Sequence, residues 1–252
     1  MDKIRDFINN NRRFHRLLEI LPGFVSWNFI LFPFWGSFVV PVFVAYLVLV
    51  FDVLWFYKSA AAGVASIVSY LKIEAAKKYD WIGDAQKLPG YDQVRHVHMI
   101  VNVNEPLHIL ERSMEAIAHS DFPKDRLIVV LAMEEREKEA PQKAEALLRK
   151  FSGKIGRIYF TLHPLLPGEV RGKSSNESYA AKWIKKKLID EEGLDIDFVT
   201  ITTSDADSVM HPKYYSYLTW SFLGSPEPYR RIWQGAVCFY NNIWKVPLVS
   251  RV

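Results

Sequence analysis

Two aspartates at the end of an apolar run are the residues of this sequence whose types and spacing most clearly suit ligand or metal binding. Asp205 and Asp207 directly follow residues 198–203, a β-branched and aromatic run that predicts a buried strand. Ligands bind beyond the carboxyl ends of strands in a parallel α/β sheet. Two carboxylates separated by a small residue can bind a hard divalent cation, which in turn can hold a diphosphate. The D-x-D pattern alone is weak, since a chain of this length contains about one by chance, and a solvated turn is the alternative. Its place after a strand favours a metal site.

Polar side chains also follow two other predicted strands. Asn104 and Glu105 come after the strand expected over residues 94–103, and Glu134 comes after the strand expected over residues 127–132. The carboxyl ends of parallel strands meet at one edge of a sheet. Three polar clusters at that edge indicate one site better than three unrelated turns.

Lys173 and Asn176 stand where a glycine-bearing loop meets a predicted helix N-terminus, a place that favours anions. Either residue can bind a phosphate, and a solvated loop lysine is the alternative for Lys173. The sequence has no His and Cys spacing typical of zinc and no Ser-His-Asp arrangement. It also lacks the G-x-x-x-x-G-K-[ST] loop and the G-x-G-x-x-G fingerprint.

The elements that would position these residues alternate between strands and helices. This alternation predicts an α/β domain, with a mostly parallel sheet flanked by helices and right-handed crossovers. Besides the strands already named, strands are expected over residues 157–162 and 232–239, and helices over residues 107–117, 140–151, 174–189 and 211–223.

A long apolar stretch precedes this domain. Residues 20–57 contain one charged side chain, Asp52, and the stretch is too long for a signal-peptide core. One membrane span needs about 20 apolar residues, so the stretch can supply two. Prolines and a glycine in its middle predict a turn between transmembrane helices over residues 17–35 and 37–57. A single long tilted span is the alternative. The hydrophobic content of 50% also favours partial burial in lipid.

Lysines and arginines lie on both sides of this stretch, which places both of its ends in the cytoplasm. Residues 59–78 are expected to form a helix along the membrane surface, which completes a membrane anchor over residues 1–80. Residues 81–93 would be a linker, and residues 94–252 the α/β domain on the cytoplasmic side. A net charge of +4 suits anionic lipid or an anionic substrate, and no basic-aromatic motif indicates a nucleic-acid partner.

Four motifs, taken in order, resemble those of family-2 glycosyltransferases, and more narrowly those of the membrane-anchored, cellulose-synthase-like branch. The resemblance covers roughly residues 94–252. It implies a GT-A fold, a nucleotide-diphosphate sugar as donor, and Mg²⁺ or Mn²⁺ as cofactor. The motifs are Asn102-Val103-Asn104-Glu105-Pro106, Asp121-Phe122-Pro123-Lys124-Asp125-Arg126-Leu127, Gly172-Lys173-Ser174-Ser175-Asn176 and Ser204-Asp205-Ala206-Asp207.

The resemblance also implies residue roles. Glu105, with Asn104 beside it, would lie near the nucleotide base and ribose. Lys173 and Asn176 would line the diphosphate. Asp205 would contact the ribose or sugar and assist Asp207, which would bind the metal.

Three departures from the family pattern accompany these roles. Glu134 and Glu135 stand where the family carries an aspartate pair, and Glu134 is the candidate substitute in the donor site. Asn102 and Val103 replace a proline and an aromatic residue. No residue matches the acceptor base or the Q-x-x-R-W segment, so the catalytic base is unassigned.

We therefore expect the donor-binding half of a membrane-anchored glycosyltransferase, incomplete at its C-terminus, with a lipid-linked or polysaccharide acceptor. The alternative is a non-catalytic membrane module that binds nucleotide or a partner subunit.

Overall fold

The computed structural model describes residues 11–166, 168–237 and 247 of the 252-residue chain. The chain divides into two compact units, one up to Ala75 and one from Ala76 onward.

Two helices make up the first unit. Helix α2 (Arg12–Gly36) begins at Asn11, whose side chain accepts a hydrogen bond from the backbone nitrogen of Phe14. Helix α3 (Pro41–Lys78) begins with a proline, which is favourable in the first turn. The turn between them confirms the predicted break. Both helices are long and apolar enough to cross a membrane.

Helix α3 continues without interruption to Lys78. Residues 59–78 are thus helical, as expected, but they continue the preceding helix and do not form a separate one. Their expected place along the membrane surface stays a prediction. The residues at the expected boundary, Ser59-Ala60-Ala61-Ala62, include three alanines, the strongest helix formers, so nothing there ends the helix.

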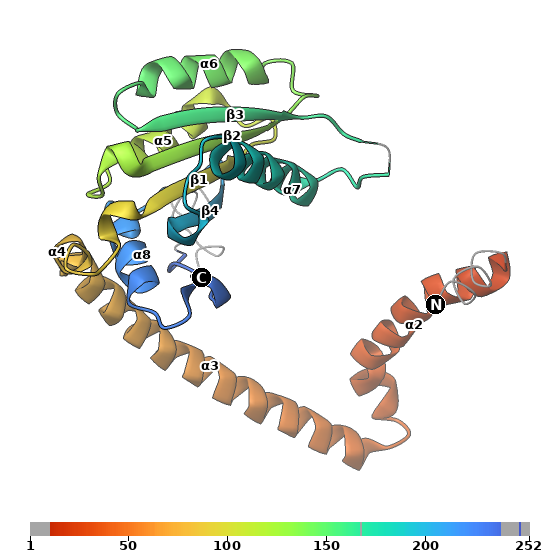
Figure 1. Ribbon diagram of the computed structural model, residues 1–252. Helices are drawn as coiled ribbons and strands as arrows, with labels where there is room; N and C mark the ends of the chain where they lie inside the picture. Colours follow the sequence, from red (N-terminus) through yellow and green to blue (C-terminus); the bar gives the residue numbers. More distant parts are fainter. Residues whose placement is uncertain (1–10, 167, 238–246, 248–252) are drawn as a thin grey trace. The chain divides into compact units, whose positions relative to one another are not determined.

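The second unit is an α/β domain (Figure 1). Among the described residues, its sheet has four strands in the order β3-β2-β1-β4, and every neighbouring pair is parallel. The predicted fold class, a parallel sheet flanked by helices, is confirmed. The strands are β1 (Arg95–Val101), β2 (Leu127–Glu134), β3 (Arg157–His163) and β4 (Val199–Asp205). The main helices are α5 (Leu107–Ala118), α6 (Ala140–Phe151), α7 (Lys173–Ile184) and α8 (Tyr214–Leu223).

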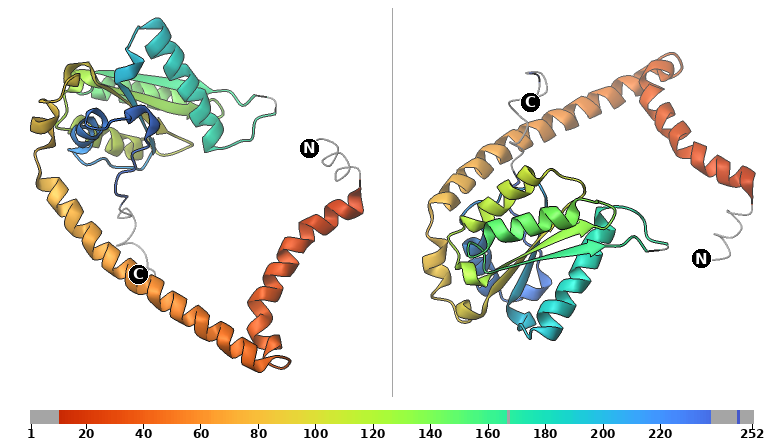
Figure 2. Two further views of the ribbon diagram at one scale, coloured as in Figure 1. Left: turned by 60° about the horizontal axis from the view of Figure 1, so that its bottom comes forward. Right: turned by 90° about the horizontal axis from the view of Figure 1, so that it is seen from above.

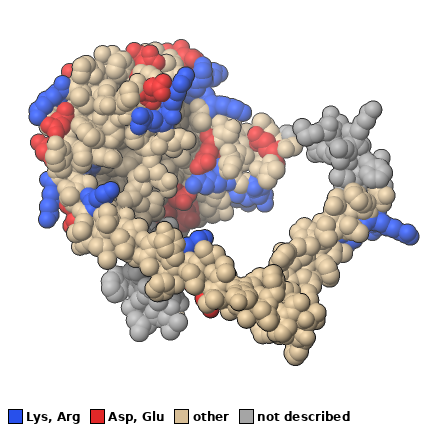
Figure 3. All heavy atoms as spheres, turned by 90° about the horizontal axis from the view of Figure 1, so that it is seen from below, with Lys and Arg blue, Asp and Glu red and all other residues tan. Residues whose placement is uncertain are grey.

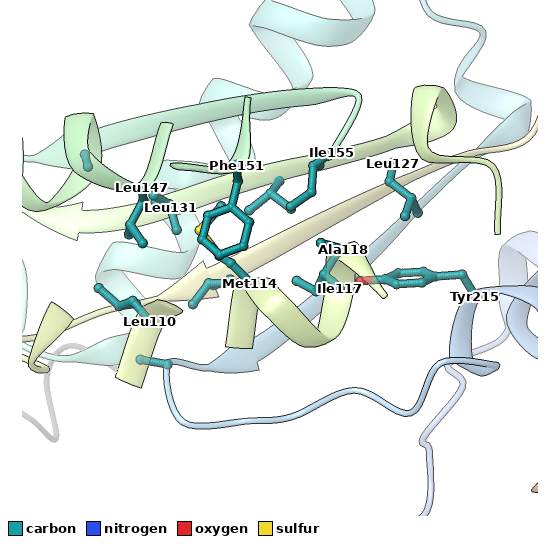
Figure 4. Close-up of a cluster of buried hydrophobic side chains, with 14 of the residues drawn as sticks. Leu110, Met114, Ile117, Ala118, Leu127, Leu131, Leu147, Phe151, Ile155 and Tyr215 are labelled. Carbon is teal, nitrogen blue, oxygen red and sulfur yellow. The ribbon is translucent and has the colours of Figure 1, made fainter. Parts of the chain in front are cut away.

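Helices cover both faces of the sheet, with α5 and α6 on one face and α7 on the other (Figures 1 and 2). Figure 4 shows the first face, where α5 contributes Leu110, Met114 and Ile117 at helical spacing. Alternate residues of the strands point to opposite faces. On β2, Leu131 therefore belongs to the core under α5 and α6, whereas Val130 belongs to the core under α7.

On the face of β1 toward α8, two buried histidines, His96 and His98, precede the apolar Ile100. The ring of His96 hydrogen-bonds to the hydroxyls of Thr200 (2.5 Å) and Thr219 (2.7 Å). The ring of His98 hydrogen-bonds to the hydroxyls of Ser204 (2.8 Å) and Tyr215 (2.7 Å). All four ring nitrogens thus have partners on β4 and α8, and a polar layer joins these elements to β1.

The segment expected to be a linker is folded. It forms α4 (Trp81–Ala85) and a 3-10 turn, η1 (Tyr91–Gln93). Helix α4 packs on α8, where the ring of Trp81 lies 4.7 Å from that of Tyr217 and 5.0 Å from that of Trp220. Sequence patterns missed α4 because it spans five residues, too few to show a period.

The fifth strand expected over residues 232–239 is not found at residues 232–237, and residues 238 and 239 lie outside the described residues. Residues 232–237 pair with no strand, and the side chain of Ile232 is almost fully exposed. An apolar run forms a strand only when a neighbouring edge and a core are available to it.

Candidate functional site

The turn after β4 presents two carboxylates to solvent. Asp205 is the last residue of β4, and both Asp205 and Asp207 are exposed. Between them, Ala206 is buried, and its carbonyl oxygen accepts a 2.6 Å hydrogen bond from the hydroxyl of Ser113 on α5. This bond fixes the backbone of the turn, while the alternation of buried and exposed residues leaves both carboxylates at the carboxyl edge of the sheet.

Lys173 lies next to this turn. Its ammonium nitrogen is 2.5 Å from Oδ1 of Asp205 and 3.6 Å from Oε1 of Glu177. The hydrogen bond to Asp205 raises the pKa of Lys173. The structure thus brings together two residues that are 32 positions apart in the sequence. The ammonium group of Lys173, the first residue of α7, thus meets the carboxylate of Asp205 at this edge of the sheet.

The donor set of this turn fits a divalent cation that is bound together with a substrate. The oxygens of Asp205 and Asp207 are hard ligands of the kind that Mg²⁺ and Mn²⁺ prefer. In the part of the chain that the structure describes, no group of three or more His, Cys, Asp or Glu side chains is arranged to hold a metal. Two carboxylates leave most coordination positions to phosphate oxygens and water, which is how Mg²⁺ is usually bound in nucleotide sites.

Asn176 lies behind this surface. It is fully buried, and its amide nitrogen donates a 2.9 Å hydrogen bond to the carbonyl oxygen of Ala132 on β2. The side chain therefore ties the first turn of α7 to the end of β2. Its expected place beside the diphosphate stays a prediction, because its amide nitrogen is directed to the backbone here.

The loop after β1 is held by a buried glutamate that the sequence patterns did not single out. The carboxylate of Glu137, 4% exposed, accepts hydrogen bonds from the amide of Asn102 (2.7 Å) and the backbone nitrogen of Asn104 (3.3 Å). Lys143 lies 2.5 Å from its other oxygen and also donates to the carbonyl oxygen of Glu105. Asn104 adopts a left-handed conformation with φ of 61°. Glu137 and Lys143 thus fix the loop that carries Asn104 and Glu105.

A pocket of about 360 Å³ opens at the ends of β2 and β3, beside the start of α7. Glu134, the last residue of β2, lines it. The side chain of Glu134 is 8% exposed, and its Oε2 pairs with Nε of Arg136. Its other oxygen, Oε1, is buried without a hydrogen-bond partner. The other residues that line the pocket are Glu135, Arg136, His163, Leu165, Arg171, Gly172 and Ser175.

Arg136 and His163 were not recognised as site residues from the sequence. His163 is buried, and its Nε2 lies 3.0 Å from Oε2 of Glu169. Glu137 was missed because it stands in the charged run Glu134-Glu135-Arg136-Glu137, where sequence alone does not distinguish the buried members. The sequence feature that does indicate site residues is a polar residue at the end of a strand, and this feature identifies Glu134.

Comparisons with known proteins add little to this geometry. No protein-family model matches the chain, and no curated protein matches it. Among solved structures, the chain is similar to a mannosyltransferase from Pyrobaculum calidifontis in complex with GDP-Man and Mn²⁺. The two share 19% identity at a TM-score of 0.38, and the match covers 67% of this chain and 42% of the other. Similarity at this level carries no inference about activity.

Proposed function

We propose that the chain is the donor-binding part of a membrane-anchored glycosyltransferase, which binds a nucleotide-diphosphate sugar together with Mg²⁺ or Mn²⁺. The observation that carries the proposal is the meeting of Lys173 with Asp205 and the adjoining Asp207 at the carboxyl edge of the sheet. The order of the four motifs, which resembles family-2 glycosyltransferases, supports it independently.

Each residue of this edge has a defined task in the proposal. Asp207 and Asp205 hold the cation, which when bound neutralises charge that develops on the leaving diphosphate. When the donor binds, the ammonium group of Lys173 leaves Asp205 and pairs with a phosphate oxygen. The positive charge of Lys173 is therefore paired both with and without the donor. The N-terminus of α7 turns its free backbone N–H groups toward the same anion. The β1–α5 loop, held by Glu137, presents Asn104 and Glu105 to the nucleoside.

We also propose that α2 and α3 anchor the protein in a membrane and that the α/β domain lies on the cytoplasmic side. The side chains of both helices are exposed almost throughout, Gly36 and Val44 being the buried residues among those described. Figure 3 shows these helices mostly in tan, with some charged side chains along them, and residues 20–57 contain one charged residue, Asp52. A helix that is apolar on all sides is stable when lipid surrounds it. A lipid-linked or polysaccharide acceptor suits an enzyme held at the bilayer.

The second candidate function is a non-catalytic membrane module that binds nucleotide or a partner subunit. The observation that favours it is the Lys173–Asp205 ion pair. This pair satisfies both charges without a ligand. A module that binds nucleotide differs from the first candidate in lacking sugar transfer, and a module that binds a partner subunit differs already in lacking nucleotide binding.

Replacing Asp207 by asparagine is expected to weaken metal-dependent nucleotide binding by about a hundredfold, because the amide removes the negative charge that binds the cation. The measurement is calorimetric titration of the full chain in detergent micelles with GDP and UDP, in Mn²⁺ and in EDTA. The matched control is Asp125→Asn, an exposed aspartate before the amino end of β2. Equal affinities in Asp207→Asn and the parent would refute the metal assignment. Absence of metal-dependent binding to the folded parent protein would refute the proposed function.

Reporters fused to the two ends of the chain are expected to lie on the same, cytoplasmic, side of the membrane. The physical reason is that one crossing by each of the two apolar helices would return the chain to the side where it began, and lysines and arginines lie on both flanks of the apolar stretch. The measurement is accessibility of each fusion to a membrane-impermeant reagent in intact cells. Reporters found on opposite sides would contradict the hairpin.

A further inference from the structure

Lys173 has a second carboxylate close by, one turn further along α7. Its ammonium nitrogen is 2.5 Å from Oδ1 of Asp205 and 3.6 Å from Oε1 of Glu177. Resting on the proposed function, we propose that Glu177 is a positioning residue for Lys173, which holds the ammonium group at the diphosphate when a cation binds Asp205. Glu177 lies outside the four motifs that resemble family-2 glycosyltransferases.

The spacing along α7 and β4 brings these side chains together in two pairs. Lys173 and Glu177 are four residues apart on α7, so they share one face of the helix, about 6 Å apart along its axis. Thr203 and Asp205 are two residues apart on β4, so they share one face of the strand, about 6.6 Å apart. Because the two spacings agree, Lys173 meets Asp205 at one level. Glu177 meets Thr203 at the next level.

The carboxylate of Glu177 is held independently of the lysine. Its Oε1 accepts a 3.0 Å hydrogen bond from the hydroxyl of Thr203. Its side chain is 28% exposed, against 49% for Lys173 and 62% for Asp205. The lysine has a flexible four-carbon stem, so it is the member of the pair that can move. Glu177 therefore offers the ammonium group a fixed second partner at a short distance.

A divalent cation changes the balance between the two carboxylates. Before it binds, Lys173 makes its shorter contact with Asp205, and this hydrogen bond is the main cause of its raised pKa. A cation bound by Asp205 brings two further positive charges close to the ammonium group, and charges of the same sign repel each other. The ammonium group then leaves Asp205. Glu177 keeps it at the edge of the sheet, where the phosphate oxygens of the donor become its other partner.

This role predicts which property changes when Glu177 loses its charge. Without the second carboxylate, Lys173 stays paired with Asp205, and the cation has to displace it. The site would then need more cation to bind the same amount of nucleotide. The effect depends on Lys173, whereas a carboxylate that attracts the cation through its own charge would act whether or not the lysine is present.

The test measures the Mn²⁺ concentration needed for half-maximal nucleotide binding. The full chain in detergent micelles is titrated by calorimetry at a series of Mn²⁺ concentrations, with GDP or UDP, whichever the parent protein binds. Glu177→Gln removes the charge but keeps the shape and an oxygen that can accept from Thr203. We expect it to raise the required Mn²⁺ concentration about fivefold, the effect of one partly exposed ion pair.

The same substitution is then made in Lys173→Met. Removing the lysine should by itself lower the required Mn²⁺ concentration, because the cation has no competitor for Asp205. It should also weaken nucleotide binding at saturating Mn²⁺, because the phosphate loses a cationic partner. In this background, Glu177→Gln should change the required Mn²⁺ concentration by less than about twofold, since the two residues act through one contact.

The matched control is Glu191→Gln. It removes the charge from another lysine–glutamate pair at the same spacing, in which Nζ of Lys187 lies 3.2 Å from Oε2 of Glu191 in the π-helical segment η3 (Lys185–Glu191). The required Mn²⁺ concentration should stay at the parent value.

Two results would overturn the inference. An equal increase with and without Lys173 would show that Glu177 acts on the cation through its own charge. An unchanged Mn²⁺ requirement in Glu177→Gln would show that Lys173 needs no second partner. Either result leaves the proposed function standing. Absence of Mn²⁺-dependent binding of both nucleotides to the folded parent protein would instead refute the proposed function, and the inference with it.

Discussion

Replacing Glu137 by glutamine is expected to lower the free energy of unfolding of the α/β domain by about 3–5 kcal/mol, the range for breaking a buried ion pair by removing one partner. The substitution keeps the shape of the side chain but removes its charge. Lys143, 14% exposed, would then lie without its main partner beside the carbonyl oxygen of Glu105. The hydrogen bonds from Asn102 and from the backbone of Asn104 would weaken together, so the loop after β1 would loosen.

The measurement is urea denaturation of the full chain in detergent micelles, followed by near-ultraviolet circular dichroism. The matched control is Glu139→Gln, which makes the same chemical change in the other glutamate near Lys143. Glu139 lies 3.6 Å from the ammonium nitrogen and its side chain is 79% exposed, so its loss should cost less than about 1 kcal/mol. Similar losses in both variants would show that burial of Glu137 does not set its contribution.

The pair of Glu137 and Lys143 also shows where sequence reasoning reaches its limit. The strands and helices of the α/β domain follow from local patterns, such as the apolar period of α5 and the continuous apolar run of β2. Which member of a charged run becomes buried depends on the lysine that meets it from another element. Burial of Glu137 therefore depends on a tertiary contact, which local sequence patterns do not reveal.

The position of the candidate site was predictable, but the contacts within it were not. Polar residues directly after strands mark the carboxyl edge of a parallel sheet, and this rule identifies Asp205, Asp207 and Glu134 from the sequence alone. The rule does not say that Asn176 turns inward to Ala132, or that Lys173 pairs with Asp205. The expected strand after residue 231 failed for a related reason, since its apolar residues needed a sheet edge that the structure does not offer them at residues 232–237.

Acid is expected to destabilise the α/β domain through His96 and His98. Burial lowers the pKa of His96 to about 3, helped by the nearby charge of Arg126, and burial lowers the pKa of His98 to about 4. In the unfolded chain both rings have a pKa near 6.5. Between these values the unfolded state binds more protons than the folded state, so stability falls as the pH falls. The contribution is fully present above about pH 6.5 and is progressively lost below it.

The hydrogen bonds of these rings explain why the neutral forms are preferred. The hydroxyl of Thr219 donates to the carbonyl oxygen of Tyr215, so it can only accept from Nε2–H of His96. The other nitrogen, Nδ1, then accepts from the hydroxyl of Thr200. A second proton on this ring would remove that acceptor and place a charge in a fully buried site. Both partners of His96 thus agree with a single neutral tautomer.

The expected loss is about 4 kcal/mol for the two histidines together between pH 7 and pH 5, since each ring costs about 1.4 kcal/mol per pH unit once the unfolded chain is protonated. Urea denaturation at several pH values measures this slope. His98→Gln should reduce the slope of unfolding free energy against pH by about half. This slope can be measured even if the variant is less stable overall. The control is His108→Gln, at an exposed position on α5, which should leave the slope unchanged. A parent protein equally stable at pH 7 and pH 5 would show that these rings accept protons in the folded state. The hydrogen bonds between β1, β4 and α8 would then have to form with protonated histidine rings.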